Sequence, residues 1–270
     1  GDIESLPYVE SVRQLCWERP DDCAVVHLTL IPYLSAAGEL KTKPTQHSVK
    51  ALQESGVFPD VLVCRTEYEI NEGIRRKLAL FCNVQTDSVI QSIDAATIYD
   101  VPKLMKEEQL DKVVLKKLGL SHTGEADITN WEEFVYHLNN PKHTVDIALV
   151  GKYVELKDSY KSISESFIHA SSFSRCKVNL HWICSEKLDA ASAIESLKNM
   201  DGVLVAPGFG PRGIEGKLYA VQYARENKIP FFGICLGMQA SVIEYARNVL
   251  HYDSAHSTEM NPKSSYPVID

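Results

Sequence analysis

The sequence predicts an α/β protein built on two parallel sheets, because apolar runs that suit buried strands alternate with segments of helical periodicity. The alternation fills residues 1–120 and starts again near residue 144. Between these regions, the polar residues 121–130 are typical of a linker. We therefore expect a first domain over 1–120, a linker with a helix over 121–143, and a second domain over 144–270.

The strands and helices of the first region follow from the period of its apolar residues. Three apolar runs predict strands, at residues 25–31, 61–64 and 89–93. Helical spacing predicts four helices, near residues 6–18, 45–55, 71–82 and 103–118. Gly56 suits the C-cap of the second helix, since glycine tolerates the left-handed backbone needed there. Strands that alternate with helices pair through crossover connections, so we expect a parallel sheet.

The elements after the linker lead to two glycine-rich turns. Thr129 and Glu132 have the spacing of a capping box and predict a helix start, and Pro141 should end that helix. An apolar run at residues 145–150 predicts the first strand of the second domain. Two strand–loop–helix units follow, with strands at 201–206 and 229–232 and loops at 207–213 and 233–237. Neighbouring parallel strands would place both loops at one edge of the sheet, where open α/β sheets bind ligands.

Cys235 stands in the second of these loops, between Gly233 and Gly237. A cysteine at a strand-to-helix turn with glycines on both sides has the pattern of a nucleophile elbow, which exposes the sulfur above the sheet. The helix N-terminus favours a thiolate and offers backbone N–H groups to an oxyanion. The alternative is a cysteine that simply belongs to the core, as free cysteines often do.

The first loop can supply a second oxyanion donor. The N–H of Gly208 can face that of Leu236, so that the two form a two-donor oxyanion hole opposite Cys235. Pro207 precedes Gly208, and it restricts the turn without removing the N–H of the next residue. The two loops therefore predict acyl-transfer chemistry with Cys235 as the nucleophile.

A short basic segment interrupts the acidic chain. It combines two lysines, two threonines and a helix start, in the order Lys41, Thr42, Lys43, Pro44, Thr45 and Gln46. This combination suits an anion, above all a chain of phosphates. The alternative is a solvated loop. Arg75 and Arg76, on the predicted helix over 71–82, are interpreted as surface charge.

Composition argues against several classes of function. The net charge of −8 disfavours a nucleic-acid partner, because binding to a phosphate backbone needs a basic surface. The sequence has neither an apolar run of about 18 residues nor a secretory signal pattern, so we expect no membrane partner. Seven scattered cysteines without metal-ligand spacing favour a reducing cytoplasm and no metal site in this chain. The sequence also lacks a P-loop pattern for ATP.

The motifs together resemble a known family. The loop at Gly208 and the elbow at Cys235 resemble those of class I glutamine amidotransferases, which have a flavodoxin-like α/β fold and a cysteine that attacks the carboxamide of glutamine. Further segments resemble motifs of the CTP synthase family and follow one another in the same order as in that family. They lie at residues 1–7, 38–49, 79–83, 150–153, 212–216 and 257–259. The resemblance implies a partial P-loop-type synthetase domain with a parallel sheet, followed by part of an amidotransferase domain.

The resemblance also implies which residues bind which substrate. Those that match the site for UTP and its competitor CTP are Asp2, Ile3, Glu4, Lys41, Thr42, Lys43, Pro44, Thr45, Gln46 and Lys77. Those that match the ATP site are Ile93, Asp94 and Ala95. Those that match the oxyanion and glutamine site are Gly208, Leu236, Gly237, Met238, Gln239 and Glu259, with Cys235 as the catalytic residue.

The implied reaction is the ATP-dependent amination of UTP to CTP with ammonia from glutamine, catalysed by a ligase of pyrimidine biosynthesis. Mg²⁺ would accompany ATP, held mostly by residues outside this chain, and GTP would be an allosteric activator. The resemblance further implies a cytoplasmic homotetramer. The alternatives are a stand-alone cysteine amidohydrolase and a non-catalytic subunit that binds nucleotide or forms filaments.

The ends of the chain lead us to expect an interior piece of a longer protein, because the sequence starts without methionine inside a matching motif. The family takes its general base from a His-x-Glu motif, which this sequence does not contain. His251 and His256 are interpreted as surface residues. We therefore expect the chain by itself to be inactive both in CTP formation and in glutamine turnover.

Overall fold

The computed structural model describes residues 3–121 and 124–270. Asp2, which the resemblance assigns to the nucleotide site, lies outside the described residues. The chain divides into two compact units, unit 1 (Gly1–Glu132) and unit 2 (Glu133–Asp270). The division falls inside the helix α6 (Thr129–Asn139), and the linker boundaries expected at residues 121 and 143 stay a prediction.

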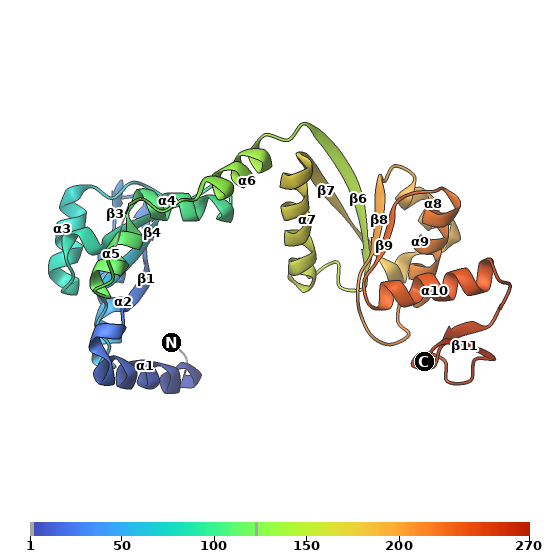
Figure 1. Ribbon diagram of the computed structural model, residues 1–270, viewed down its shortest axis with the longest axis horizontal. Helices are drawn as coiled ribbons and strands as arrows, with labels where there is room; N and C mark the ends of the chain where they lie inside the picture. Colours follow the sequence, from blue (N-terminus) through green and yellow to red (C-terminus); the bar gives the residue numbers. More distant parts are fainter. Residues whose placement is uncertain (1–2, 122–123) are drawn as a thin grey trace. The chain divides into compact units, whose positions relative to one another are not determined.

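Unit 1 contains a three-stranded parallel sheet in the order β1-β4-β5, flanked by helices (Figure 1). Its strands are β1 (Val26–Ile31), β4 (Val61–Thr66) and β5 (Val89–Ile93), with a small hairpin of β2 (Tyr33–Leu34) and β3 (Glu39–Leu40). Its helices are α1 (Leu6–Glu18), α2 (Lys43–Glu54), α3 (Glu72–Cys82), α4 (Val101–Glu107) and α5 (Leu110–Lys117). The three sheet strands and the helices α1, α2 and α3 confirm the elements predicted from apolar periodicity.

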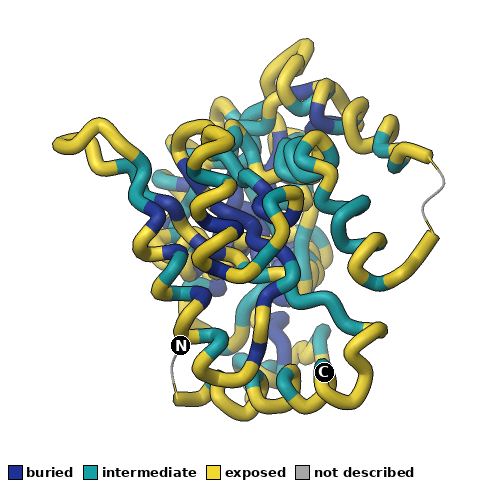
Figure 2. Tube along the Cα trace, turned by 90° about the vertical axis from the view of Figure 1, so that its left-hand side faces the viewer, coloured by how far each residue is buried: buried dark blue, intermediate teal, exposed yellow. Residues whose placement is uncertain are grey.

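Both faces of the central strand β4 are covered, and this strand is apolar along most of its length, whereas Leu28 and Leu30 of β1 are exposed. Leu62 shares one core cluster with Val49 of α2 and Leu78 of α3. Val61 points to the opposite face and packs with Val113 of α5. Leu62 and Val61 thus face opposite sides of the sheet, as the two-residue period of a strand requires. Figure 2 shows buried residues toward the inside of the trace and exposed residues along its outside.

The prediction of a single helix over 103–118 is wrong. The segment forms two helices, α4 and α5, and Gln109 between them takes a left-handed backbone with φ 59°. The carboxylate of Glu108 accepts two hydrogen bonds from Arg75, at 2.8 and 2.9 Å, and one from the N–H of Gln91, at 2.9 Å. The ion pair with α3 and the hydrogen bond from β5 hold Glu108 at the point where the helix is interrupted. Arg75 is therefore partly buried and not the surface charge that we expected.

The prediction of a capping box at the start of α6 is also wrong. Thr129 lies inside the helix, and both its hydroxyl and its N–H donate to the carboxylate of Asp127, at 2.7 and 3.0 Å. The N–H of Glu132 bonds to the carbonyl of Ile128. Asp127 therefore supplies the acceptor that we had assigned to Thr129, as carboxylates at helix starts often do.

Unit 2 contains a four-stranded parallel sheet in the order β7-β6-β8-β9 (Figure 1). Its strands are β6 (His143–Gly151), β7 (Cys176–Cys184), β8 (Gly202–Val205) and β9 (Phe231–Gly233), and β10 (Ala255–Ser257) pairs separately with β11 (Tyr266–Ile269). Its helices are α7 (Lys161–Ser174), α8 (Ala190–Leu197), α9 (Ile214–Glu226) and α10 (Leu236–Asn248). When the strands of this sheet are numbered along the chain, their order in space is 2-1-3-4. This is the flavodoxin-like order, and it confirms the predicted fold class.

The core of unit 2 lies on both faces of β8. Val205 packs with Leu218 of α9 and Ile243 of α10 on one face. Leu204 packs toward Phe167 of α7 on the other face. The loops after β8 and β9 leave from the carboxyl edge of the sheet, next to each other in the strand order. Within the described residues, no helix has the length and apolar character needed to cross a membrane.

Candidate active site

Cys235 is the N-cap residue of α10 and has a strained backbone. Its φ of 52° and ψ of −109° lie in a region that residues with a side chain rarely adopt. The residue is exposed at the point where β9 ends and α10 begins. The alternative of a core cysteine is therefore wrong.

Close packing requires the glycines on both sides of Cys235. A Cβ atom on Gly237 would lie 2.1 Å from the carbonyl oxygen of Val205, at the end of β8. A Cβ atom on Gly233 would lie 2.5 Å from the backbone of Gly237. Atoms cannot approach this closely, so glycine at both positions lets α10 start directly against the ends of β8 and β9.

The other cysteines are less exposed than Cys235. Burial raises the pKa of Cys64 to about 12 and that of Cys82 to about 11. Burial also raises the pKa of Cys16, and Cys176 is buried as well. Because only a thiolate is an effective nucleophile, Cys64 and Cys82 are inert near neutral pH.

The loop after β8 lies against the elbow. Gly208 has φ 157°, and a Cβ atom there would lie 3.7 Å from the side chain of Leu236. The N–H of Ile234 donates to the carbonyl of Val205 at 3.0 Å, which joins the bases of the two loops. The backbone N–H groups of Gly208 and Leu236 therefore belong to adjacent segments, as a two-donor oxyanion hole requires.

Residues expected to contact glutamine lie at the same loops. The exposed carboxylate of Glu259 accepts a hydrogen bond from the N–H of Gly210 at 3.0 Å. Gln239, one turn into α10, has a buried side-chain oxygen with no partner among the described residues, and its neighbour Met238 is exposed. This oxygen is an unsatisfied buried polar atom close to the elbow.

Lys217, which sequence reasoning missed, lies beneath the loop. It is fully buried in α9, and its Nζ donates to the carbonyl of Ala206 at 2.6 Å and to that of Pro207 at 3.4 Å. The sequence held a signal, because Lys217 stands three residues after Ile214 and four before Val221, on the apolar face of the helix. A lysine on that face needs a buried acceptor.

A second buried lysine, Lys152, follows β6. It donates to the carbonyls of Phe209 and Gly210, at 2.6 and 3.0 Å. Burial lowers its pKa, and the positive charge of Arg212 lowers it further. Arg212 itself pairs with Glu186 at 3.1 Å.

The two histidines near the elbow differ. His251 is exposed, as expected. The expectation that His256 is a surface residue is wrong, because it is buried in β10 and its Nδ1 accepts the N–H of Ser257 at 3.0 Å. Burial lowers the pKa of His256. The charges of Arg247 on α10 and Glu215 on α9 also act on His256, and nothing in its immediate sequence indicated these neighbours.

The basic segment of unit 1 forms the start of α2. No side chain among the described residues caps this helix, although Thr42 occupies its N-cap position. Lys43 is exposed there, and Lys41 pairs with Glu39 of β3. A hydrogen bond from Lys41 lowers the pKa of Glu39, and the charge of Lys77 on α3 contributes in the same direction. The structure thus brings Lys41 and Lys77, distant in sequence, near one carboxylate.

The two threonines of this segment have internal partners. Thr45 is fully buried, donates to the carbonyl of Leu30 at 3.0 Å and accepts from Thr29 at 3.2 Å. The hydroxyl of Thr42 accepts from the side chain of Gln46 at 3.2 Å. The contacts of Thr45 attach the start of α2 to β1, while Pro44 in the first turn is exposed.

The residues expected at ATP follow the last strand of the same sheet. Ile93 ends β5, and Asp94 and Ala95 come next, at the carboxyl edge. Asp94 pairs with Arg65 at 3.3 Å. Ile3 and Glu4 lie in the exposed 3₁₀ turn η1 (Ile3–Ser5).

Two family models match the chain. A model described as CTP synthase N-terminus matches residues 1–120. A model described as glutamine amidotransferase class-I matches residues 155–266, which include both Gly208 and Cys235.

Curated relatives match over the whole chain. It is 66% identical over 271 residues to a CTP synthase of Flavobacterium psychrophilum and 63% identical over 271 residues to one of Flavobacterium johnsoniae. It is 54% identical over 270 residues to a CTP synthase of Bacteroides fragilis. Each match covers 100% of this chain but 50%, 50% and 51% of the relative. The chain thus spans about half the length of the curated relatives that it matches.

One solved structure with similarity is the glutaminase domain of Trypanosoma brucei CTPS with bound acivicin. The TM-score is 0.44 and the sequence identity 41%, over 45% of this chain and 48% of that chain.

Proposed function

The chain belongs to the CTP synthase family, and we propose that it carries the glutaminase nucleophile and part of the UTP site of a ligase that forms CTP. The proposed overall reaction is the ATP-dependent amination of UTP with ammonia from glutamine. The observation that carries the proposal is an exposed cysteine, held at φ 52° on a helix N-terminus, next to the glycine loop at Gly208.

In unit 2, the proposed reaction begins when the Cys235 thiolate attacks the carboxamide carbon of glutamine. The new C–S bond displaces the carbonyl electron pair onto oxygen, and the N–H groups of Gly208 and Leu236 donate to this oxyanion. When the intermediate collapses, the C–N bond breaks, and the nitrogen takes a proton from water and leaves as ammonia. Water then hydrolyses the thioester to glutamate. Glu259 and Gln239 would hold the amino-acid end of the substrate.

In unit 1, we place the triphosphate of UTP, or of CTP as inhibitor, at the N-terminus of α2. Lys41, Lys43 and Lys77 would supply charge-assisted contacts to its oxygens. ATP, bound near residues 93–95, would phosphorylate O4 of the uracil, because a carbonyl oxygen is a poor leaving group. Ammonia would then displace the phosphate and give CTP.

Family resemblance supports Mg²⁺ as the companion of ATP, GTP as an activator and a cytoplasmic homotetramer. Within the described residues, no group of three or more His, Cys, Asp or Glu side chains could hold a metal ion, and we derive no step through Mg²⁺. The two alternatives have less support. A stand-alone cysteine amidohydrolase leaves the basic segment at residues 41–46 without a role, and a non-catalytic subunit does not need a strained, exposed Cys235.

Iodoacetamide should modify Cys235 faster than any of the other six cysteines, by about tenfold at pH 7.5. Its sulfur is exposed at a helix N-terminus, whereas burial raises the pKa of Cys16, Cys64 and Cys82. Peptide mapping of the partly labelled chain measures each rate, with Cys235→Ala as the control that removes the main product. Faster labelling of Cys16 or Cys184 would refute the assignment of the nucleophile.

Lys41→Ala should weaken UTP and CTP binding about tenfold or more, because a charge-assisted contact to phosphate contributes about 1.5–3 kcal/mol. Calorimetry would measure both affinities in a full-length CTP synthase that contains this chain. Lys50→Ala is a matched control, since Lys50 is an exposed lysine of the same helix, distant from its N-terminus. Equal affinities for the Lys41→Ala variant and the unmodified enzyme would contradict the proposed phosphate site.

A further inference from the structure

Two buried lysines, Lys152 and Lys217, donate hydrogen bonds to backbone carbonyls of the segment between β8 and α9. Both hydrogen bonds of Lys217 go to backbone carbonyls, those of Ala206 and Pro207. Lys217 is fully buried, yet within the described residues its hydrogen bonds reach no carboxylate. A buried positive charge without a carboxylate partner is costly, and such groups gather at functional sites.

The direction of one hydrogen bond fixes the direction of another across a peptide unit. The described residues contain no cis peptide bond, so each carbonyl points away from the N–H of the following residue. The carbonyl of Phe209 is directed at Lys152, and on the other side the N–H of Gly210 donates to Glu259. By the same geometry, a Pro207 carbonyl directed at Lys217 turns the N–H of Gly208 away from the interior.

We propose that Lys217 is a positioning residue of the glutaminase centre, which aims the Gly208 N–H at the oxyanion and places a positive charge beneath the Cys235 thiolate. This inference rests on the proposed function, because it takes Cys235 as the nucleophile. It assigns a role to a fully buried side chain that never touches substrate.

The charges around Lys217 support the second part of this role. Burial and, less strongly, the charge of Lys152 lower its pKa to about 8, while the charge of Cys235 acts in the opposite direction. The interaction is mutual, so a protonated Lys217 favours the thiolate. Lys152 is itself influenced by Arg212, Glu186 and Glu259. Lys217 is mainly charged at pH 7 and mainly neutral above about pH 9.

The charge can be tested by the pH dependence of Cys235 alkylation in the 270-residue chain. Lys217→Met removes charge and donor, and Lys217→Gln keeps a donor without the charge. With iodoacetamide, we expect both variants to react about tenfold slower than the unmodified chain at pH 7. The rates should agree within about twofold at pH 9.5, where Lys217 is neutral in the unmodified chain as well. Lys198→Met, an exposed site on the same unit, should match the unmodified chain at every pH.

The positioning role needs a reaction that passes through an oxyanion. A glutamate γ-nitrophenyl ester acylates sulfur when the thiolate attacks the ester carbon, the C–O bond breaks and nitrophenolate leaves with the electron pair. Alkylation has no such intermediate. Lys217→Met should lower the ratio of acylation to alkylation rate at pH 9.5 about tenfold or more, and Lys217→Gln should retain most of it.

The outcomes separate the two roles from each other and from the proposed function. The same rate deficit at pH 7 and at pH 9.5 overturns the charge role, and an unchanged ratio in Lys217→Met overturns the positioning role. Amide exchange of α9 verifies that the variants are folded; if the Met variant unfolds, Lys217→Gln carries the alkylation test. If Cys235 is not the cysteine labelled first in the unmodified chain, the proposed function fails, whatever Lys217 does.

Discussion

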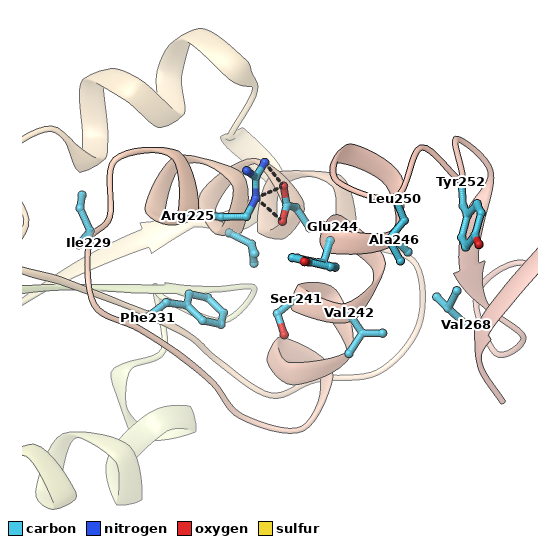
Figure 3. Close-up of a pocket in the computed structure, with 12 residues that line it drawn as sticks. Arg225, Ile229, Phe231, Ser241, Val242, Glu244, Ala246, Leu250, Tyr252 and Val268 are labelled. Carbon is cyan, nitrogen blue, oxygen red and sulfur yellow. Dashed lines mark hydrogen bonds and ion pairs between the residues drawn. The ribbon is translucent and has the colours of Figure 1, made fainter.

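Replacing Arg225 by methionine should destabilise unit 2 by about 3 kcal/mol. Glu244 of α10 is 1% exposed, and Arg225 of α9 donates to both of its carboxylate oxygens, at 2.7 to 3.1 Å (Figure 3). Without the guanidinium, the buried carboxylate would keep the side-chain amide of Asn248, at 3.0 Å. This destabilisation is at the lower end of the usual range for a broken buried ion pair, because the side chain of Arg225 is 33% exposed.

Amide hydrogen exchange resolved by peptide is a suitable measurement, because a chain of two units does not unfold in one step. Peptides of α10 and β8 should exchange roughly a hundredfold faster in Arg225→Met, since each 1.4 kcal/mol is a factor of ten. Peptides of unit 1 serve as the internal reference. Exchange of α10 within twofold of the unmodified chain would contradict the prediction.

A second variant distinguishes the loss of a contact from the presence of an unpaired buried charge. Arg225→Met combined with Glu244→Leu removes both charges, and such replacements of buried pairs are often nearly neutral. The double variant should therefore be more stable than Arg225→Met alone. Glu226→Gln is the matched control: it removes the charge of an exposed partner of Arg225, at 3.4 Å, and should change stability by less than about 1 kcal/mol.

The elbow could be predicted from sequence because its requirements are local. A strand, a cysteine between two glycines and a helix start are all visible within one short segment, and they determine the backbone at Cys235. The parallel pairing of the strands in both sheets likewise follows from the alternation of apolar strand segments with helical segments. The strand β7 was not predicted, because it is an edge strand and most of its residues are only partly buried.

The features that could not be predicted depend on partners distant in sequence. Glu108 interrupts a helical pattern because Arg75 and the backbone of β5 reach its carboxylate. His256 is buried, and the charged groups that act on it, Arg247 and Glu215, stand on the helices α10 and α9. Lys217 can be buried because its Nζ donates to a carbonyl at the start of the loop that leads into its own helix. Apolar periodicity carries no information on such contacts, since it reports which face is buried and not what lies against it.

Gly237→Ala should destabilise unit 2 by about 3 kcal/mol and should also remove the preferential alkylation of Cys235. The added Cβ would lie 2.1 Å from the carbonyl oxygen and 2.9 Å from the carbonyl carbon of Val205. Both are backbone atoms of a buried strand, so no side-chain rotation relieves the clash and α10 must move away from β8. That movement would also separate the N–H of Leu236 from the neighbouring loop at Gly208.

Exchange of the α10 and β8 amides and the iodoacetamide rate of Cys235 measure the two effects in one sample. Gly73→Ala is the control, since Gly73 lies in the first turn of α3 and a Cβ there would meet only the side-chain oxygen of Asn71, at 3.3 Å. That substitution should change stability by less than about 1 kcal/mol. If Gly237→Ala kept both the slow exchange and the fast alkylation of the unmodified chain, the elbow would not depend on the tight approach of α10 to β8. Loss of both properties, with Gly73→Ala unaffected, would show that one backbone contact sets the stability of the turn and the reactivity of its cysteine.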